Sequence, residues 1–418
     1  MENDYRTAVS MLRQGQAPGN SAVLNEISVG ILPFVQFLKE KYLLEYISNG
    51  GSKIKFVTGK TGSGKTHFLQ LLAAEAEKAG FVTVMFSAKD IWLHDFQVIY
   101  SEIFANTDLM GCLHKCAARI IGELGHNESD IPIGQSFADY LSGMGEFDAF
   151  TKKEIRNQLQ NTFLKNQLMD KNFAIACGLL TGGILGHPVL EEQNKEILLQ
   201  WLSGNTSVKL PAIRHLGLAP SKITKHNARH MLRSLAEAHK MAACPGILVL
   251  IDNVDILASA GSTDTIRYTK LRRTDAYESI RELIDEIDTL GNIMFIFSFD
   301  KKLIDDEQNG LKSYYALWAR IQNEIVSDRF NQFTDIIDLD SLGKLIYTKE
   351  KVVEMSERLA DIFNRERYEA KSIDTGTAEE ILFNVTFANV SLPRQIGQAT
   401  ISTTLNETVA TEEDITND

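Results

Sequence analysis

The chain has 418 residues, with 43 basic and 55 acidic side chains and a formal charge of −12. Hydrophobic residues make up 44% of the sequence and charged residues 23%, which excludes a wholly disordered protein. The acidic balance also excludes a whole-molecule field that attracts nucleic acid, so any such binding would depend on a local basic patch.

The sequence carries few signs of an oxidising compartment or of a membrane. Four cysteines in a chain of this length are not typical of a disulfide framework. No basic segment followed by an apolar run begins the chain, and the least charged stretch, 173–190, is too short and too rich in glycine to cross a bilayer. We therefore expect a soluble, cytoplasmic protein without a membrane partner.

The N-terminal region is predicted to be helical. Apolar residues recur at three- to four-residue spacing over 4–15 and again over 31–48, and Asn49-Gly50-Gly51 ends the second helix. We interpret residues 1–50 as an N-terminal helical linker.

Strands then alternate with helices. Apolar, β-branched runs predict strands at 53–58, 81–86, 246–251, 292–297 and 334–339, and a helix is expected at 67–78. This alternation predicts an α/β fold, a parallel five-stranded sheet flanked by helices. We assign 51–104 and 236–341 to this core.

The remaining segments are expected to be helical. The stretch between the second and third strands is too long for one crossover helix, so residues 105–235 are predicted to form a large helical insertion. Helical periodicity resumes near 345, which predicts a C-terminal helical lid over 342–406, and residues 407–418 are expected to be an acidic tail.

A phosphate-binding loop lies between the first strand and its helix. The octapeptide Gly59-Lys60-Thr61-Gly62-Ser63-Gly64-Lys65-Thr66 fits G-x-x-x-x-G-K-[ST], the Walker A pattern. Its backbone N–H groups and the helix N-terminus favour phosphate oxygens, and Lys65 would reach the β- and γ-phosphates. We expect ATP as the cofactor, contacted by Gly59, Thr61, Gly62, Ser63, Gly64, Lys65, Thr66 and His67.

An acidic residue ends the third strand, as in a Walker B motif. Asp252 follows an apolar run, and with the Thr66 hydroxyl it would hold Mg²⁺. Many ATPases carry glutamate at the next position, as the base that activates water, but this chain has Asn253. Asparagine orients water without accepting its proton, so Asp255 is a substitute candidate. We expect hydrolysis that is slow, or that needs a partner or a rearrangement.

A polar residue is also predicted at the end of the fourth strand. Ser298 would contact the γ-phosphate or the attacking water there, as a sensor residue, if it does not simply cap a turn.

The order of the strands and motifs resembles the additional-strand (ASCE) class of P-loop NTPases, and within it the AAA+ proteins. That resemblance implies a lid arginine that reaches the nucleotide, and Leu392-Pro393-Arg394 places Arg394 there as sensor 2. It also implies an arginine finger presented to a neighbouring subunit of a homo-oligomeric ring or spiral. Arg320 and Arg329 are candidates for the finger, or are ordinary surface arginines.

A closer resemblance depends on the order of several short segments. They are Leu12 to Pro18, Ile27 to Gly30, the Walker A loop, Leu93 to Tyr100, Leu199 to Gly204, Walker B, and Gly310 to Tyr314. In this order they resemble the ATP-binding proteins of BREX-type phage-defence loci. The resemblance implies a bacterial defence ATPase with a helicase-like partner. We expect this ATPase to act on or load onto DNA with a helicase- or nuclease-type partner.

One segment reverses the overall charge. Between 209 and 233 the chain has no acid, and from Ser221 onward we predict an amphipathic helix with a basic face. This face would contact DNA phosphates, or would be a solvated surface or a contact to an acidic neighbouring subunit. Its basic residues are Lys209, Arg214, Lys222, Lys225, Arg229 and Arg233.

Two other functions stay open. Asn253 is compatible with an ATP-gated switch that controls a partner with little hydrolysis. A transposition-regulator-like ATPase that assembles on DNA and recruits an effector is the other alternative.

Overall fold

A parallel sheet forms the centre of the protein. The computed structural model describes residues 2–259, 266–321, 335–385 and 391–401. The five strands lie in the order β2-β3-β4-β1-β5, and every neighbouring pair is parallel. Their bounds are β1 Ser52–Gly59, β2 Val82–Ser87, β3 Ile247–Asp252, β4 Ile293–Asp300 and β5 Ile336–Asp338.

Both faces of the sheet are buried, as expected when helices cover a parallel sheet. Along β3, Ile247, Val249 and Ile251 face one core, and Leu248 and Leu250 face the other. Strand β4 lies between β1 and β3. The predicted α/β fold with a five-stranded parallel sheet flanked by helices is therefore confirmed, and it is a P-loop NTPase-like arrangement.

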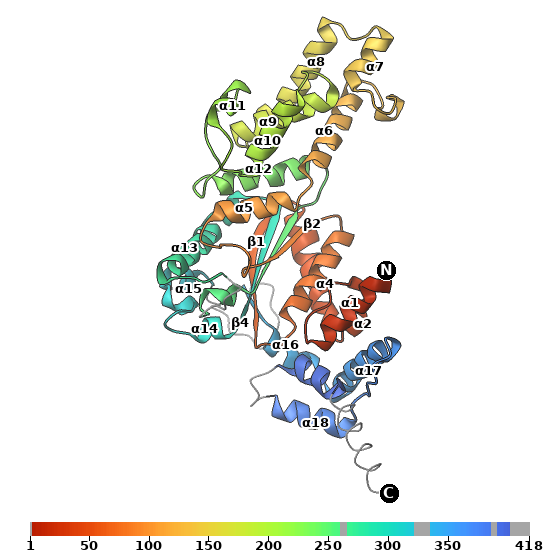
Figure 1. The fold of residues 1–418 in the computed structure, drawn as a ribbon, viewed down its shortest axis with the longest axis vertical. Coiled ribbons are helices and arrows are strands. Elements are labelled where there is room, and N and C mark those ends of the chain that lie inside the picture. The colour runs from red at the N-terminus through yellow and green to blue at the C-terminus, as the bar shows by residue number, and fades with distance from the viewer. Residues whose placement is uncertain (1, 260–265, 322–334, 386–390, 402–418) are drawn as a thin grey trace.

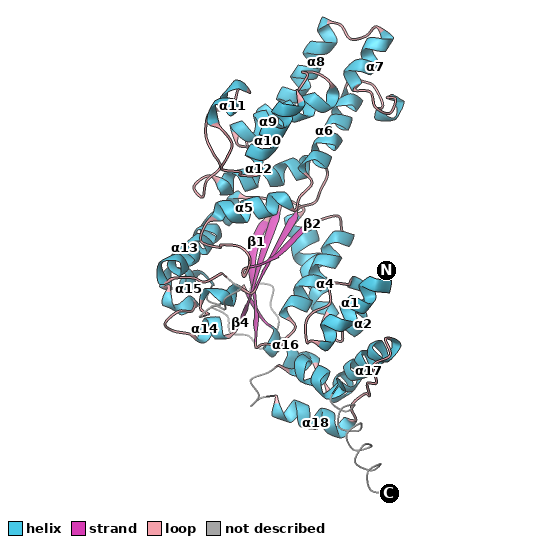
Figure 2. Ribbon diagram, viewed as in Figure 1, coloured by secondary structure: helices cyan, strands magenta, loops and turns pink. Residues whose placement is uncertain are grey.

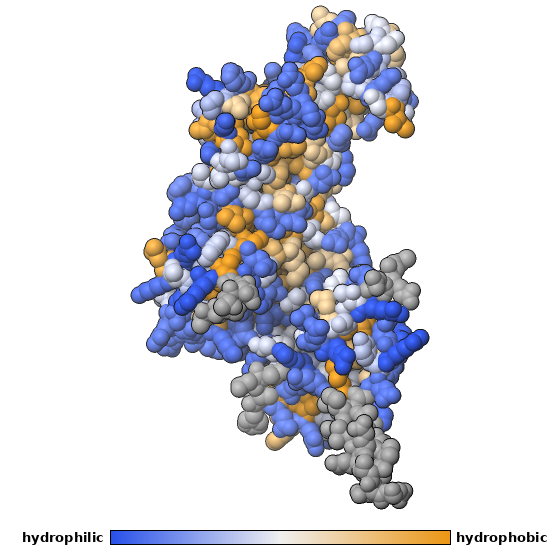
Figure 3. Space-filling view, in the orientation of Figure 1, coloured by the Kyte–Doolittle hydropathy of each residue, from blue (hydrophilic) through white to orange (hydrophobic). Residues whose placement is uncertain are grey.

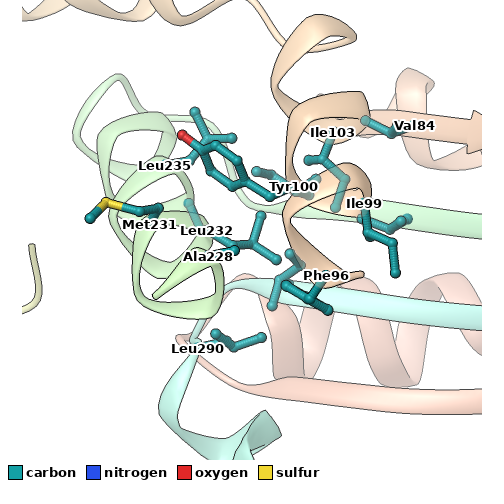
Figure 4. Close-up of a cluster of buried hydrophobic side chains, with 14 of the residues drawn as sticks. Val84, Phe96, Ile99, Tyr100, Ile103, Ala228, Met231, Leu232, Leu235 and Leu290 are labelled. Carbon is teal, nitrogen blue, oxygen red and sulfur yellow. The ribbon is translucent and has the colours of Figure 1, made fainter. Parts of the chain in front are cut away.

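One face is covered by α4 (Lys65–Lys78), α3 (Leu32–Leu38) and the π-helical segment η1 (Lys39–Ile47). The other is covered by α5 (Phe96–Ala105), α12 (Ala228–Met241), α13 (Lys270–Glu286) and α15 (Tyr315–Ile321). Figure 4 shows α5 packed on α12, with Tyr100 directed toward Leu235 and Ile103 lying beside Val84 of β2. The short elements of this part of the core are η4 (Val254–Leu257), η5 (Ile287–Thr289), α14 (Lys302–Asp305) and η6 (Leu311–Ser313).

The helices between α5 and α12 extend away from the sheet (Figure 1). They are α6 (Leu109–Glu123), η2 (Glu128–Asp130), α7 (Phe137–Met144), α8 (Ala149–Leu159), η3 (Gln160–Leu164), α9 (Lys171–Leu185), α10 (Glu192–Leu202) and α11 (Leu210–His215). The apolar helix α9 is at their centre, in contact with α6, α8 and α10. Figure 2 shows that all of these elements are helical and lie at the end of the sheet where the strands begin.

A third core lies at the opposite end of the molecule. Helix α16 (Leu339–Ile346) follows β5 and leads to α17 (Lys349–Arg365) and α18 (Thr375–Asn384), and residues 392–401 are also helical. Helices α1 (Glu2–Arg13) and α2 (Ser21–Ile27) share this core through Val9 and Val23. The N-terminal segment is therefore not a simple linker, because its helices form part of the same hydrophobic core as the C-terminal helices.

Within the described ranges, none of the helices has the length and the apolar content that crossing a membrane requires.

Candidate nucleotide-binding site

The carboxyl ends of the strands meet beside one large cavity. Gly59 ends β1, Asp252 ends β3 and Asp300 ends β4, and Gly59 and Asp300 are paired directly across the sheet. Ligands of open α/β sheets bind at this edge. The cavity measures about 790 Å³, and its walls come from the predicted phosphate loop, the N-terminal helices and the C-terminal helices.

The loop after β1 has the backbone that a phosphate cradle needs. Gly62 and Gly64 have φ angles of +83° and +86°, in the left-handed region that favours glycine. A Cβ added to Gly62 would lie 2.5 Å from the Cβ of Arg394, so both conformation and space require glycine. Helix α4 begins at Lys65, which places its N-terminus beside the loop.

Lys65 is folded over the loop that precedes it. Its Nζ donates hydrogen bonds to the carbonyl oxygens of Gly59, at 2.8 Å, and Lys60, at 3.0 Å. Burial lowers the pKa of Lys65, and nearby carboxylates, Asp300 first, oppose that shift. The ammonium group is therefore held at the floor of the cavity among acceptors that an anionic ligand would replace.

The two predicted magnesium ligands are adjacent. The Thr66 hydroxyl donates a hydrogen bond of 2.6 Å to Oδ2 of Asp252, whose side chain is buried. Among the described residues, no group of three or more His, Cys, Asp or Glu side chains could hold a metal ion. This pair nevertheless fits Mg²⁺, because Mg²⁺ commonly takes one or two protein ligands and completes its shell with phosphate oxygens and water.

Asn253 also lines the cavity, and its side chain contacts the end of β2. Its Nδ2 donates to Oγ of Ser87 at 3.2 Å, and its backbone is left-handed, with φ of 59°. Asparagine tolerates this conformation better than most residues do. Asp255 lines the same cavity, and its Oδ1 accepts a hydrogen bond of 3.0 Å from the backbone of Asp300.

The predicted position of Ser298 is wrong. Strand β4 continues for two residues past Ser298, which is fully buried opposite Val57 and has no hydrogen-bond partner for its hydroxyl among the described residues. Asp300 is at the strand end instead, where it lines the cavity and accepts a hydrogen bond of 2.8 Å from the Thr61 hydroxyl. The signal for Asp300 was the alternation Phe297-Ser298-Phe299-Asp300, which continues the strand.

The N-terminal segment forms one wall of the cavity, which motif reasoning missed. Residues 11–18 and several of 27–31 line it. In the sequence, these segments carry only the family resemblance and no binding motif. His67 connects this wall to α4, because its Nε2 is 2.8 Å from Oγ of Ser28. Burial lowers the pKa of His67 to about 4, so the ring is neutral at pH 7.

The C-terminal helices contact the predicted phosphate loop directly. The backbone N–H of Ser391 donates to the carbonyl of Thr61 at 3.2 Å, and its hydroxyl donates to Asp340 at 3.0 Å. Asp340 in turn accepts a hydrogen bond of 2.6 Å from the backbone of Lys60. Arg394, three residues after Ser391, lines the cavity above Gly62.

Comparison with known protein families agrees with this geometry. The family model for "BREX system ATP-binding protein BrxC/D" matches residues 2–409. The chain belongs to this family. No curated protein matches the sequence.

One arginine-finger candidate of this BREX-family protein, Arg320, lies away from the nucleotide cavity of its own chain. Arg320 is on α15, paired with Asp285, and lines a smaller pocket of about 210 Å³ beside the first residues of β1. That is the end of the strand opposite the phosphate loop. Arg329 lies outside the described residues. Whether either arginine acts in a neighbouring subunit stays a prediction.

The basic stretch of the family member differs from the expected single helix. Residues 221–227 are not helical, and α12 begins at Ala228. Arg229 is buried, stacks on Phe96 and pairs with Glu282 and Glu286, so its place on an exposed basic face is a wrong prediction. Arg233 is half-buried. The exposed members of the set are Lys209, Arg214, Lys222 and Lys225.

Proposed function

We propose that this BREX-family protein is an AAA+ P-loop ATPase that binds ATP with Mg²⁺ between its N-terminal helices, the Gly59–Thr66 loop and the C-terminal lid. The observation that carries this proposal is the contact between Thr66 and Asp252 at 2.6 Å, at the edge of the sheet where the loop and α4 meet. The bound ion would supply positive charge beside the phosphates.

Different residues around the cavity would contact different parts of ATP or position the walls of the site. The loop backbone and the N-terminus of α4 would hold the phosphates, and Lys65 would leave the carbonyls of Gly59 and Lys60 for phosphate oxygens. Arg394 lies on the opposite side, above Gly62, where its charge would meet the same phosphates. His67 is neutral and contacts Ser28, so it would position the wall of the site.

Hydrolysis is proposed to be slow. Asn253 would orient the attacking water without accepting its proton. Asp255 and Asp300 are the carboxylates that line the cavity beside it, and the hydrogen bond between them fixes their relative position. Either carboxylate would serve as the base if the nucleotide moves water toward it.

We further propose that the lid reports the nucleotide state to the rest of an assembly. Ser391 and Asp340 contact the backbone of the phosphate loop, so a loop that reshapes around phosphate would move the lid. Homo-oligomers of ring or spiral form would then assemble with ATP, act on DNA in the cytoplasm and engage a helicase- or nuclease-type component of the BREX system.

An ATP-gated switch is the second candidate, and Asn253 favours it. Its hydrogen bond to Ser87 connects the cavity to β2 without placing a base there. A switch of this kind would bind ATP, change its assembly state and recruit an effector, with turnover that DNA does not stimulate.

Mass measurement by light scattering tests the proposal together with steady-state ATP turnover. We expect ATP to convert monomers into a discrete oligomer, and DNA to raise turnover. A protein that assembles with ATP but shows no DNA-stimulated turnover would favour the switch. Unchanged mass and no turnover under all conditions would contradict both candidates.

A further inference from the structure

A second surface of interest lies beside the Walker B end of the sheet. It consists of Trp92 and His94 in the loop after β2, Arg267 and Tyr268 before α13, Lys270 and Arg272 in the first turn of α13, and Lys225. We call these residues the Trp92 surface. None of them has a role in the nucleotide site described above, and only Lys225 belongs to the basic stretch of the sequence analysis.

Two backbone contacts hold the segments of this surface together. The N–H of Ile266 donates to the carbonyl of Lys89 at 3.4 Å, and the N–H of Leu93 donates to the buried hydroxyl of Tyr268 at 2.8 Å. Thr269 caps the start of α13. The loop after β2 and the start of α13 therefore form one fixed unit.

Arg272 is held by aromatic side chains. Its guanidinium carbon lies 4.4 Å from the centre of the Trp92 ring, a cation–π contact. Tyr268 and His94 meet the same indole edge-on, at 5.2 Å and 5.0 Å between ring centres. Arg272 is nevertheless exposed, so a flat, oriented guanidinium group is presented to solvent.

The charge of this surface is not neutralised within the described part of the protein. Arg229, Arg281 and Arg320 of the same core all pair with carboxylates. In contrast, no ion pair with a described residue forms at the exposed side chains of Arg267, Lys270, Arg272 and Lys225. In a chain of charge −12, these cations form a local positive surface. Figure 3 shows hydrophilic residues mixed with apolar ones in the region of α13.

The acids near this surface have other roles or lie at its margin. Asp95 caps α5 by accepting from the backbone of Gln97, and Asp90 and Asp275 are exposed at either side. Burial lowers the pKa of His94, and the charge of Arg272 and, less strongly, that of Lys225 lower it further, while Asp95 and Asp275 raise it and only partly offset the shift. His94 therefore stays neutral, and the positive charge of the surface comes from its arginines and lysines.

We propose that the Trp92 surface binds single-stranded nucleic acid, with backbone phosphates on Arg267, Lys270 and Lys225 and a base stacked on the outer face of the Arg272 guanidinium. Oriented cations beside aromatic rings are the combination that binds single strands without sequence preference. A planar guanidinium both stacks on a base and donates to phosphate, which an ammonium group cannot do. This inference rests on the proposed function, because it names the surface through which a DNA-acting ATPase would hold its substrate.

The surface is connected to the nucleotide site through a short segment. Lys89 lines the nucleotide cavity and its carbonyl holds Ile266, while Ser87, two residues earlier, accepts the hydrogen bond from Asn253. A strand bound at Trp92 would therefore constrain the loop that begins at the contact with Asn253. This continuity gives nucleic acid a route to influence ATP turnover.

Binding is tested with a fluorescein-labelled oligothymidylate, by anisotropy in the presence of ATP. We expect Arg267→Glu with Lys270→Glu to weaken binding by about tenfold or more and to reduce its salt dependence. Arg272→Ala should weaken binding by about tenfold, since a stacking contact is lost. The matched control is Arg214→Glu with Lys209→Glu, which reverses one arginine and one lysine on and just before α11 and should leave binding unchanged.

Tryptophan fluorescence gives a second readout that a merely misfolded variant would not mimic. The chain has three tryptophans, and Trp201 is buried in the insertion. We expect the oligonucleotide to quench the emission of the wild-type protein and of Trp318→Phe, but not that of Trp92→Phe. ATP turnover without DNA should be unchanged in the Arg267→Glu, Lys270→Glu variant, which confirms that it folds.

The outcomes separate this inference from the proposed function. Weakening by the control pair alone would overturn the Trp92 surface and leave a DNA-acting ATPase in place. Equal binding of an abasic oligomer of the same length, or tighter binding of a duplex, would also overturn the stacked single strand. A wild-type protein that binds ATP but no nucleic acid would overturn both this inference and the DNA role in the proposed function.

Discussion

Replacing Asn253 with glutamate tests whether proton abstraction limits hydrolysis. The side chain lines the cavity and contacts Ser87 at 3.2 Å, so a glutamate there would place a carboxylate beside the site of attack. A positioned general base contributes about 10²–10⁴-fold to rate. Asp255 and Asp300 already line the cavity and would supply part of this effect. We therefore expect turnover to rise by at least about tenfold, but by less than the full contribution of a general base.

The left-handed backbone at position 253 should lower the stability of the Asn253→Glu variant, and a control variant with the same strain separates this effect from catalysis. Asn253 has φ of 59°, and a residue that tolerates the left-handed region poorly would lose about 1 kcal/mol of stability there. Asn253→Gln has nearly the same length as glutamate and the same strain, but it cannot accept a proton. Steady-state phosphate release should therefore rise in Asn253→Glu and not in Asn253→Gln, with similar melting temperatures. Equal turnover in the two variants would refute the reasoning and place the base at Asp255 or Asp300.

Three further perturbations follow from the structure. Gly62→Ala and Gly217→Ala both add backbone strain at positive φ, but of these two glycines only Gly62 faces Arg394. Calorimetry should therefore show weaker ATP binding for Gly62→Ala and not for Gly217→Ala. An equal loss of ATP affinity in both variants would count against phosphate binding by the loop around Gly62. Arg229→Met should cost about 1 kcal/mol in urea unfolding, because the two glutamates it frees are about half exposed and rehydrate, and it should leave DNA binding intact. Hydrogen bonds from Lys39, then Lys78 and Gln36, lower the pKa of Glu75 from 4.5 to about 2. A carboxylate whose pKa is lower in the folded protein stabilises the fold above pH 4.5, and this stabilisation is lost as the pH falls toward 2. The free energy of unfolding of Glu75→Gln should therefore be about 2 kcal/mol below that of the wild type at pH 7, and clearly closer to it at pH 3. The same difference at both pH values would contradict the assignment.

Local patterns predicted the sheet and the glycine-rich loop before α4 because their signals are contained in short segments. Strand β3 is apolar throughout and ends in Asp252, and glycines punctuate the turn before α4. Ser298 was predicted at a strand end because the apolar run suggested that the fourth strand stops at 297, whereas β4 continues to Asp300. Where a strand stops depends on its neighbour, and β1 pairs with β4 as far as Gly59 and Asp300.

Contacts between distant segments could not be predicted in this way. The basic stretch contains Arg229, but only the fold shows that Glu282 and Glu286 neutralise it. The N-terminal helices pack on the C-terminal helices, which lie more than 300 residues later in the sequence, and no local pattern encodes that pairing. The Trp92 surface has the same origin, since Trp92 and Arg272 meet only after the sheet has formed.

Calorimetric titration of ATP with Mg²⁺ into the wild-type protein and into Lys65→Ala tests most directly whether the Gly59–Thr66 loop holds the phosphates. With one nucleotide per chain at the Gly59–Thr66 loop, the wild type should bind at one site. Lys65→Ala should show no measurable binding while it melts at a similar temperature. Tight binding by a folded Lys65→Ala variant would contradict the central claim that this loop holds the phosphates.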